Sequence, residues 1–235
     1  MINQPELIIV TPVYNESTVI EQFIPDWVLY LRSLNIQFEL RLYDDGSTDN
    51  SPQLIRQFLA EYHEVKYFKK ANTGHGPTVT QGYQAATDFY WIFQIDSDHE
   101  LPFSDFEKLW SDRDKYDLLL GRRIKRNSST FRNMLTLLTS LFVKVLAGTG
   151  INDINTPYRL IKGQKLQTFL LHNNPQNFAP NVVMSAYAIR NKWKIVEHPI
   201  VPLRTRQLKK RGYSLYLLKG GISTALELIR FSIKK

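Results

Sequence analysis

The sequence predicts an α/β fold in which a mostly parallel sheet is flanked by helices. Apolar runs of strand length alternate with longer stretches whose apolar residues recur at helical spacing, and this alternation is typical of parallel sheets. Each strand-like run of the N-terminal half is followed by polar residues, as at the ligand-binding edge of such sheets. The length of 235 residues suits one large domain.

The first elements are a strand, a helix and a second strand. Leu7 to Val10 is continuously apolar, which predicts a buried strand. Apolar residues at helical spacing predict a helix from about Ser17 to Ser33. Phe38 to Tyr43 has the composition of a second strand.

Four further elements continue the alternation. Ser51 to Tyr62 is expected to be a helix, which Asp49 or Asn50 is placed to cap. Val65 to Phe68 is expected to be a short strand, and a turn rich in glycine follows it. The last two elements of this half are a helix ending near Ala86 and the strand Tyr90 to Ile95.

Polar clusters follow the four expected strands at their carboxyl ends. These clusters are Thr11 to Glu16, Asp44 to Asp49, Asn72 to Gly76 and Asp96 to Glu100. Because the carboxyl ends of parallel strands share one edge of a sheet, the four clusters are expected to form one binding site.

Charge is distributed unevenly about Gly121. There are 19 acidic and 9 basic residues up to Gly121, but 3 acidic and 21 basic residues beyond it, in a chain of net charge +8. The basic half predicts a polyanionic partner, which is a nucleic acid, an anionic membrane surface or a phosphorylated substrate. The absence of cysteine excludes disulfides, thiolate metal sites and a cysteine nucleophile.

Two apolar stretches of the basic half bear on membrane contact. Charged residues interrupt both Phe131 to Leu146 and Tyr213 to Ile233, so neither has the composition of a membrane-spanning helix. They are expected to lie in a membrane interface or to pack on the protein. Met1 to Glu6 is short and polar, and no signal peptide is expected from it.

Asp96, Ser97 and Asp98 end the fourth expected strand. Carboxylates two residues apart in a turn can approach one hard cation, and Mg²⁺ or Mn²⁺ held in this way completes its shell with substrate phosphates. Glu100 is a candidate third ligand. The alternative is that this tripeptide only caps the next helix near Pro102, and the tripeptide by itself does not separate the two interpretations.

The Asp44 to Asp49 segment also allows two interpretations. A carboxylate at this strand end can accept hydrogen bonds from a base or a ribose, and Gly46 lets the backbone turn closely. Alone, the segment is an ordinary turn and helix cap. Its position beside Asp96 and Asp98 favours the binding role.

Taken together, these motifs resemble those of family 2 glycosyltransferases of the GT-A fold over roughly residues 6 to 125. The motifs are Thr11-Pro12-Val13-Tyr14-Asn15-Glu16, Asp44-Asp45-Gly46-Ser47-Thr48-Asp49, Asn72-Thr73-Gly74-His75-Gly76 leading to Ala85-Ala86, and Asp96-Ser97-Asp98. The resemblance implies a nucleotide-sugar donor and a diphosphate held with Mg²⁺ or Mn²⁺ by Asp96 and Asp98. The donor-binding residues that it implies are Pro12, Tyr14, Glu16, Asp44, Asp45 and Gly74.

The basic half resembles polyprenyl-phosphate sugar transferases of the dolichol-phosphate mannose synthase type. The matching segments are Leu119-Leu120-Gly121-Arg122-Arg123, Asp153-Ile154-Asn155-Thr156-Pro157-Tyr158-Arg159-Leu160 and Glu197-His198-Pro199-Ile200. The resemblance implies that Arg123 and Arg159 bind the lipid phosphate. The chain departs from this subfamily in having Glu100 where the subfamily has Gln, and in matching its basic motif only partly at Lys209 to Leu215.

Acid–base chemistry also favours a phosphate acceptor. A sugar hydroxyl must lose a proton as it attacks, whereas a phosphate monoester is already anionic and needs Arg or Lys to position it. Beyond Asp117 the only carboxylates are Asp153, Glu197 and Glu227. Two alternatives remain open, namely that Asp153 forms an ion pair with Arg159, or that Asp153 is itself a catalytic base.

The sequence therefore predicts an inverting glycosyltransferase that works as a peripheral protein on the cytoplasmic face of the membrane, alone or with an integral membrane partner or a second copy. Its expected parts are a GT-A domain, 1–202, with a donor half, 1–121, and an acceptor half, 122–202, and a basic amphipathic tail, 203–235. The nearest alternative transfers sugar to a hydroxyl of a polysaccharide or glycolipid. A nucleic-acid-binding role is not expected, because no recognisable reader motif is present.

Overall fold

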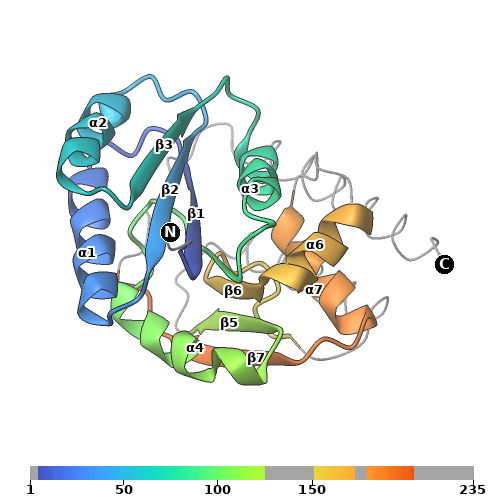
Figure 1. The fold of residues 1–235 in the computed structure, drawn as a ribbon. Coiled ribbons are helices and arrows are strands. Elements are labelled where there is room, and N and C mark those ends of the chain that lie inside the picture. The colour runs from blue at the N-terminus through green and yellow to red at the C-terminus, as the bar shows by residue number, and fades with distance from the viewer. Residues whose placement is uncertain (1–4, 125–150, 173–178, 204–235) are drawn as a thin grey trace.

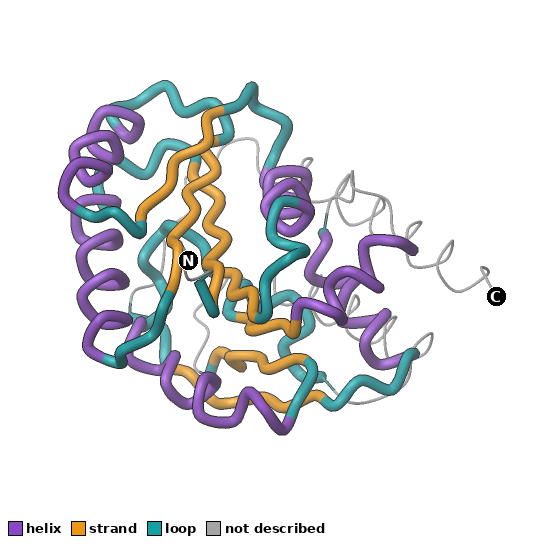
Figure 2. The backbone as a smooth tube through the Cα atoms, viewed as in Figure 1, coloured by secondary structure: helices purple, strands orange, loops and turns teal. Residues whose placement is uncertain are grey.

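The computed structural model describes residues 5–124, 151–172 and 179–203. These residues form one seven-stranded sheet of order β3-β2-β1-β4-β6-β5-β7. Figure 2 shows the strands gathered between the helices. The strands are β1 (Leu7–Val13), β2 (Phe38–Asp44), β3 (Val65–Lys69), β4 (Trp91–Gln94), β5 (Leu118–Arg123), β6 (Arg159–Lys162) and β7 (Ile195–Ile200).

Helices cover both faces of the sheet (Figure 1). The first layer contains α1, α2 and α4, and the second contains α3, α6 and α7. The helices are α1 (Ile20–Ser33), α2 (Ser51–Glu61), α3 (His75–Gln84), α4 (Phe106–Asp112), α6 (Gly163–His172) and α7 (Pro180–Arg190). The sequence-based expectation of helices and strands in alternation is confirmed for the N-terminal half.

The sheet is mostly parallel, as predicted. β1 pairs in parallel with β2 and with β4, and β2 pairs in parallel with β3. The carboxyl ends of these four strands therefore lie at one edge of the sheet. β6 was not among the expected strands, and it runs antiparallel between β4 and β5. β5 crosses the expected boundary at Gly121, so both predicted halves contribute to the same sheet.

The core lies on both faces of the sheet, which explains why β1 is apolar along its length. Leu7 and Ile9 pack in the cluster beneath α1, whereas Ile8 and Val10 pack in the cluster beneath α3 and α7. Trp27 of α1 is fully buried. Such double-sided burial stabilises the strands whose ends carry the polar clusters.

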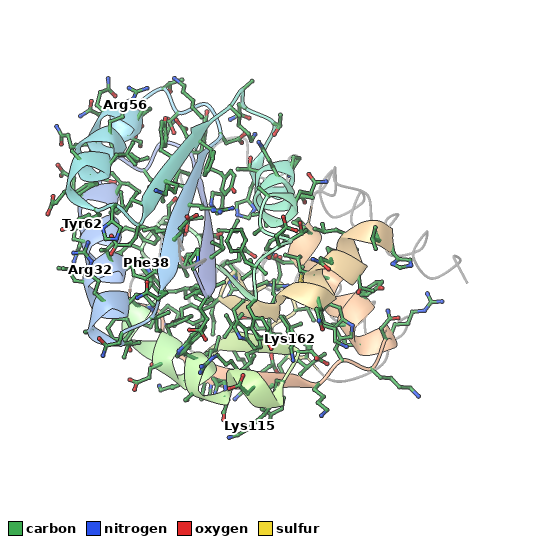
Figure 3. The ribbon with its side chains drawn as sticks, in the orientation of Figure 1. Arg32, Phe38, Arg56, Tyr62, Lys115 and Lys162 are labelled. Atoms are coloured by element: carbon green, nitrogen blue, oxygen red, sulfur yellow. The ribbon has the colours of Figure 1, made fainter. Side chains whose placement is uncertain are left out.

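The outer surface of the first layer carries an ion pair near the start of β3, at the opposite end of the strands from the polar clusters. Figure 3 shows Arg32 and Tyr62 close together at this surface. The guanidinium of Arg32 lies 5.3 Å from the centre of the Tyr62 ring and donates to Glu64 over 2.7 and 2.8 Å. This pair belongs to the packing of α1 against the end of α2.

Two expectations about membrane contact fall largely outside the described residues. The segments Phe131 to Leu146 and Tyr213 to Ile233 lie there, as does the expected tail except for Leu203. Within residues 5–124, 151–172 and 179–203, no helix has the length and hydrophobicity needed to cross a bilayer.

Candidate active site

The strand-end clusters meet at one edge of the sheet, and Asp45 joins two of them. Its carboxylate accepts hydrogen bonds from the backbone amides of Thr73, over 2.8 Å, and Gly74, over 2.9 Å, and forms an ion pair with Lys70. Burial raises the pKa of Asp45, but the hydrogen bonds from Lys70 and Thr73 outweigh burial, so the pKa is lowered. Asp45 thus fixes the loop that leads into α3, where Gly74 adopts a φ of +96°.

The segment after β1 is held by side chains of the segment after β2. The amide of Asn15 donates to Ser47 Oγ over 3.0 Å, and the amide of Glu16 donates to Ser51 Oγ over 2.8 Å. The amide of Ser17 donates to Asp49 Oδ2 over 3.0 Å. The Asn15 side chain accepts in return from the amide of Thr48 over 2.8 Å. These contacts satisfy three consecutive amides and leave the Tyr14 side chain 47% exposed beside them.

Asp49 caps α2, as one of the two interpretations of its motif requires. Its Oδ1 accepts from the amide of Ser51 over 2.9 Å. Burial raises the pKa of Asp49, but its hydrogen bonds with Ser51 and Ser17 outweigh burial and lower the pKa to about 2. The motif Asp44 to Asp49 therefore has a structural role whatever it binds.

Asp44 is enclosed by the protein. It is fully buried, and its two oxygens accept from the amide of Ser47 over 2.8 Å and from the hydroxyl of Tyr67 over 2.6 Å. Burial and the hydrogen bond to Asp44 raise the pKa of Tyr67. Tyr67 was not identified from the sequence, because an aromatic residue on a strand usually indicates packing.

Asp96 and Asp98 follow β4 at the same edge. His75 Nε2 lies 3.0 Å from Asp96 Oδ1, and Ser97 Oγ donates to the carbonyl of Pro12 over 2.8 Å. Burial raises the pKa of Asp96, but the charge of His75 and its hydrogen bond outweigh burial and lower it. Burial and the charges of Asp96 and Glu100 raise the pKa of Asp98 to about 7. Negative charge at this strand end is therefore only partly balanced.

This pair of carboxylates fits a divalent cation. Hard cations take oxygen ligands, and Mg²⁺ often binds one or two carboxylates and completes its shell with phosphate and water. Among the described residues, no three His, Asp or Glu side chains converge to form a metal site on their own. Asp96, Asp98 and Glu100 are thus not gathered as a set of three ligands, and the expected part of Glu100 stays a prediction.

His99 anchors the turn that carries Asp98. Its Nε2 lies 3.0 Å from Asp26 Oδ2 on α1, and its side chain is buried. The backbone of His99 has a φ of +54°, a left-handed conformation that is uncommon outside glycine. Sequence patterns do not distinguish this histidine from the others, because its partner is 73 residues away in the chain.

Arg123 and Asp153 lie at the same edge of the sheet, where β5, which runs parallel to β4, ends. Arg123 Nε donates to Asp153 Oδ2 over 2.7 Å, and Arg123 Nη2 donates to Asp153 Oδ1 over 2.8 Å. Burial lowers the pKa of Arg123, but the hydrogen bond and charge of Asp153, and the charges of Asp96 and Glu100, outweigh burial and raise it. The guanidinium therefore lies in the field of the carboxylates that follow β4.

Arg159 begins β6 near this edge, but its side chain is enclosed by the protein. Its side chain is fully buried and donates to the carbonyls of Thr156, Asn181 and Ile154. Burial lowers its pKa to about 10. The ion pair considered between Asp153 and Arg159 is wrong, because the carboxylate of Asp153 binds Arg123 instead. The reason is β6, which places Arg159 between Gln94 of β4 and Leu120 of β5 in the middle of the sheet.

Comparison with known proteins identifies the family. Residues 8–193 match the family described as glycosyl transferase family 2. The chain belongs to this family.

Curated relatives from bacteria are similar over most of the chain. The undecaprenyl-phosphate 4-deoxy-4-formamido-L-arabinose transferase of Proteus mirabilis is 24% identical over 185 residues, which are 77% of this chain and 56% of that protein. The enzyme of the same name from Yersinia pestis is 24% identical over 223 residues, covering 92% of this chain and 66% of that protein. The chain thus spans between about half and two thirds of the length of these relatives.

Solved structures confirm the predicted GT-A fold. The mannosyltransferase PcManGT of Pyrobaculum calidifontis, in complex with GDP-Man and Mn²⁺, matches with a TM-score of 0.66 and 18% identity, covering 100% of this chain and 66% of that one. Glucosyl-3-phosphoglycerate synthase of Mycobacterium tuberculosis, in complex with Mn²⁺, UDP-Glc and phosphoglyceric acid, matches with a TM-score of 0.63 and 16% identity, covering 97% and 80%.

Proposed function

We propose that the chain is an inverting glycosyltransferase that moves a sugar from a nucleoside diphosphate sugar to a polyprenyl phosphate, such as undecaprenyl or dolichyl phosphate. The observation that carries this proposal is the Arg123–Asp153 pair beside Asp96 and Glu100. It puts a guanidinium suited to a phosphate next to the carboxylates suited to a cation. The curated relatives named for undecaprenyl phosphate support the same acceptor class.

The donor is proposed to bind along the edge formed by β1 to β4. Tyr14 offers an exposed ring for the base, with Pro12 and Glu16 on the same segment. Asp44 binds the amide of Ser47 in the segment after β2, and Asp45 holds Gly74 at the start of α3, whose N-terminus favours an anion. These six residues would recognise the nucleotide mainly through a rigid backbone, because most of their polar groups already have partners in the protein.

The diphosphate is proposed to lie at Asp96 and Asp98 with Mg²⁺ or Mn²⁺, and Glu100 close by. When bound, the cation would neutralise charge on the departing nucleoside diphosphate. Asp98 would be held ionised by that cation, although burial and its acidic neighbours raise its pKa in the protein alone. His99 fixes the turn that presents both carboxylates.

The acceptor phosphate is proposed to meet Arg123. A phosphate oxygen is anionic at neutral pH, so its attack on the anomeric carbon needs no base. The bond from that carbon to the nucleoside diphosphate breaks as the new bond forms on the opposite face, so the configuration is inverted. Both oxygens of Asp153 are bound to Arg123, so this carboxylate is placed to orient the guanidinium rather than to take a proton. Arg159 would attract the acceptor phosphate only through its buried positive charge, without touching it.

Membrane association is proposed to be peripheral, on the cytoplasmic face. A polyprenyl phosphate presents its phosphate at the membrane surface, and clusters of Lys and Arg bind anionic headgroups. The basic part of the sequence supplies such clusters, including Lys209, Lys210 and Arg211. An integral membrane protein or a second copy of the chain would be a compatible partner.

A donor-consumption assay tests this function. The purified chain is incubated with UDP and GDP sugars, Mn²⁺ or Mg²⁺, and a short-chain polyprenyl phosphate, with Asp98→Ala as the inactive variant. Glu64→Gln is the matched variant, because it alters a bound carboxylate of the distant Arg32 pair. Transfer to the lipid phosphate that Asp98→Ala abolishes and Glu64→Gln retains is expected. Metal-dependent hydrolysis of the donor without a lipid product would favour a hydroxyl acceptor instead, and no donor use would contradict the proposal.

A further inference from the structure

A second carboxylate, that of Glu197, lies behind the Arg123–Asp153 pair. Glu197 of β7 accepts hydrogen bonds from two consecutive residues of the segment 151–158. The amide of Asn152 lies 3.0 Å from both carboxylate oxygens, Asn152 Nδ2 lies 2.6 Å from Oε2, and the amide of Asp153 lies 2.9 Å from Oε1. Glu197 therefore fixes the backbone of a segment that lies about 45 residues earlier in the chain.

The strand pairing closes these contacts into a ring. β5 and β7 run in parallel, with Leu120 opposite Glu197 and Arg123 opposite Ile200. The segment 151–158 is held to β7 by Glu197 and to β5 by Asp153, which accepts from the side chain and the amide of Arg123. Arg123 is thus oriented by a carboxylate whose own backbone is fixed from the neighbouring strand.

Close packing where the segment meets β5 allows this arrangement. Thr156 Oγ1 donates to the carbonyl of Gly121 over 2.7 Å, and the amide of Gly121 donates to the carbonyl of Tyr158 over 2.8 Å. A Cβ atom on Gly121 would lie 2.7 Å from side-chain carbons of Tyr158 and Ile200. The segment therefore has little room to shift relative to β5.

We propose that Glu197 is a positioning residue for the acceptor: it fixes the amides of Asn152 and Asp153, so that Asp153 holds the Arg123 guanidinium where the acceptor phosphate binds. This inference rests on the proposed function. A free arginine side chain loses much rotational entropy when it binds a phosphate, and prior orientation reduces that loss. Glu197 bonds amide groups of the segment rather than the guanidinium, so it does not compete with an acceptor phosphate for Arg123.

Glu197→Gln tests the inference, with Asp117→Asn as its matched control. Asp117 Oδ2 accepts from the amide of Lys194 over 2.9 Å, so it fixes backbone at the opposite end of the same two strands. The Michaelis constants for donor and polyprenyl phosphate are measured in both variants. Amide hydrogen exchange of the peptide that contains residues 151–158 is measured as well.

Glu197→Gln is expected to raise the acceptor KM about tenfold, to leave the donor KM unchanged and to speed exchange at residues 152 and 153, because a charge-assisted contact is lost. Asp117→Asn is expected to leave all three unchanged. In an Arg123→Ala background, Glu197→Gln should cause no further rise in acceptor KM. Additive effects would show that Glu197 acts independently of Arg123 and would overturn the inference, as would an unchanged acceptor KM in the single variant.

The Arg123→Ala variant separates failure of the inference from failure of the proposed function. If Arg123→Ala itself leaves the acceptor KM unchanged, the proposed function fails at the acceptor, and the inference fails with it. If Arg123→Ala raises that constant and Glu197→Gln does not, only the inference fails. Thermal unfolding establishes that each variant is folded, and Glu197→Asp, with its shorter side chain, is read by the same criteria if Glu197→Gln does not fold.

Discussion

The carboxyl edge of the sheet has a proposed donor part and a proposed acceptor part, the donor edge and the acceptor edge, and these balance their charges differently. At the donor edge, where β1 to β4 end, Asp96 and Asp98 lie close together, and the pKa of Asp98 is raised to about 7. At the acceptor edge, where β5 and β7 end, Asp153 binds a guanidinium and Glu197 binds amides. The donor edge is therefore suited to a cation from solution, whereas the acceptor edge is organised by the protein itself.

Asp98→Asn should have the largest effect and should separate activity from stability. Transfer is expected to fall about a thousandfold, because charge on the departing diphosphate loses its electrostatic partner. Stability without metal is expected to rise by about 1 to 2 kcal/mol at pH 8, because a repelled carboxylate is removed. Steady-state kinetics and urea unfolding in chelator measure the two effects. A variant both inactive and less stable would show that Asp98 is structural.

The same carboxylate predicts how stability depends on pH. The folded pKa of Asp98, about 7, is above its ordinary value, so the folded state holds a proton that the unfolded state releases. The unfolding free energy in chelator is therefore expected to fall as pH rises from about 4 to 7. The expected fall is up to about 2 kcal/mol, because solvent screening reduces the electrostatic contribution. Asp98→Asn should remove this fall. Persistence of the same slope in the variant would assign it to other groups.

Arg159→Met tests the enclosed part of the acceptor side. Removing the buried guanidinium leaves the carbonyls of Ile154, Thr156 and Asn181 without their donors, and the expected loss of stability is about 3 kcal/mol. Thermal and urea unfolding measure it. A stable variant that has lost only acceptor affinity would mean that Arg159 reaches the acceptor after all.

Arg123→Lys should raise the acceptor KM about tenfold and leave the stability nearly unchanged. A lysine keeps the charge but cannot make the two parallel hydrogen bonds to Asp153 or to a phosphate. Donor hydrolysis in the absence of acceptor provides the control, because the donor edge is untouched. Equal loss of donor hydrolysis would show that the two edges do not work separately.

Asp49→Ala should have the smallest effect, a loss of about 1 kcal/mol of stability, since it removes a helix cap and the acceptor of the Ser17 amide. Its folded pKa, lowered to about 2, means that this contribution is present above about pH 4 and is lost as pH falls towards 2. Urea unfolding at pH 7 and pH 3 measures it. An equal loss at both values of pH would exclude the ionised carboxylate as its source.

The donor edge could be predicted from the sequence because its parts are local. Each strand and the polar cluster after it are neighbours in the chain, so the parallel topology alone brings Asp45 to Gly74 and His75 to Asp96. Family membership and the GT-A fold followed from the same motifs. What these residues bind stays a prediction.

The acceptor edge could be predicted only in part because its contacts depend on strand order. The insertion of β6 between β4 and β5 decides that Arg123 pairs with Asp153 and that Arg159 is enclosed. Nothing in the spacing of these residues distinguishes the two arginines. The contacts of Glu197 with the segment 151–158 could not be predicted, because its partners lie about 45 residues away in the chain.

The order of the strands in the sheet also determines which part of the sheet can form first during synthesis. The unit β3-β2-β1-β4 has all its strands once residue 94 has been synthesised, so it can pair while the rest of the chain is still emerging. β5 neighbours only β6 and β7, which are synthesised later. On the ribosome, the proposed donor edge can therefore form first, and the proposed acceptor edge is completed only after β7 has been synthesised.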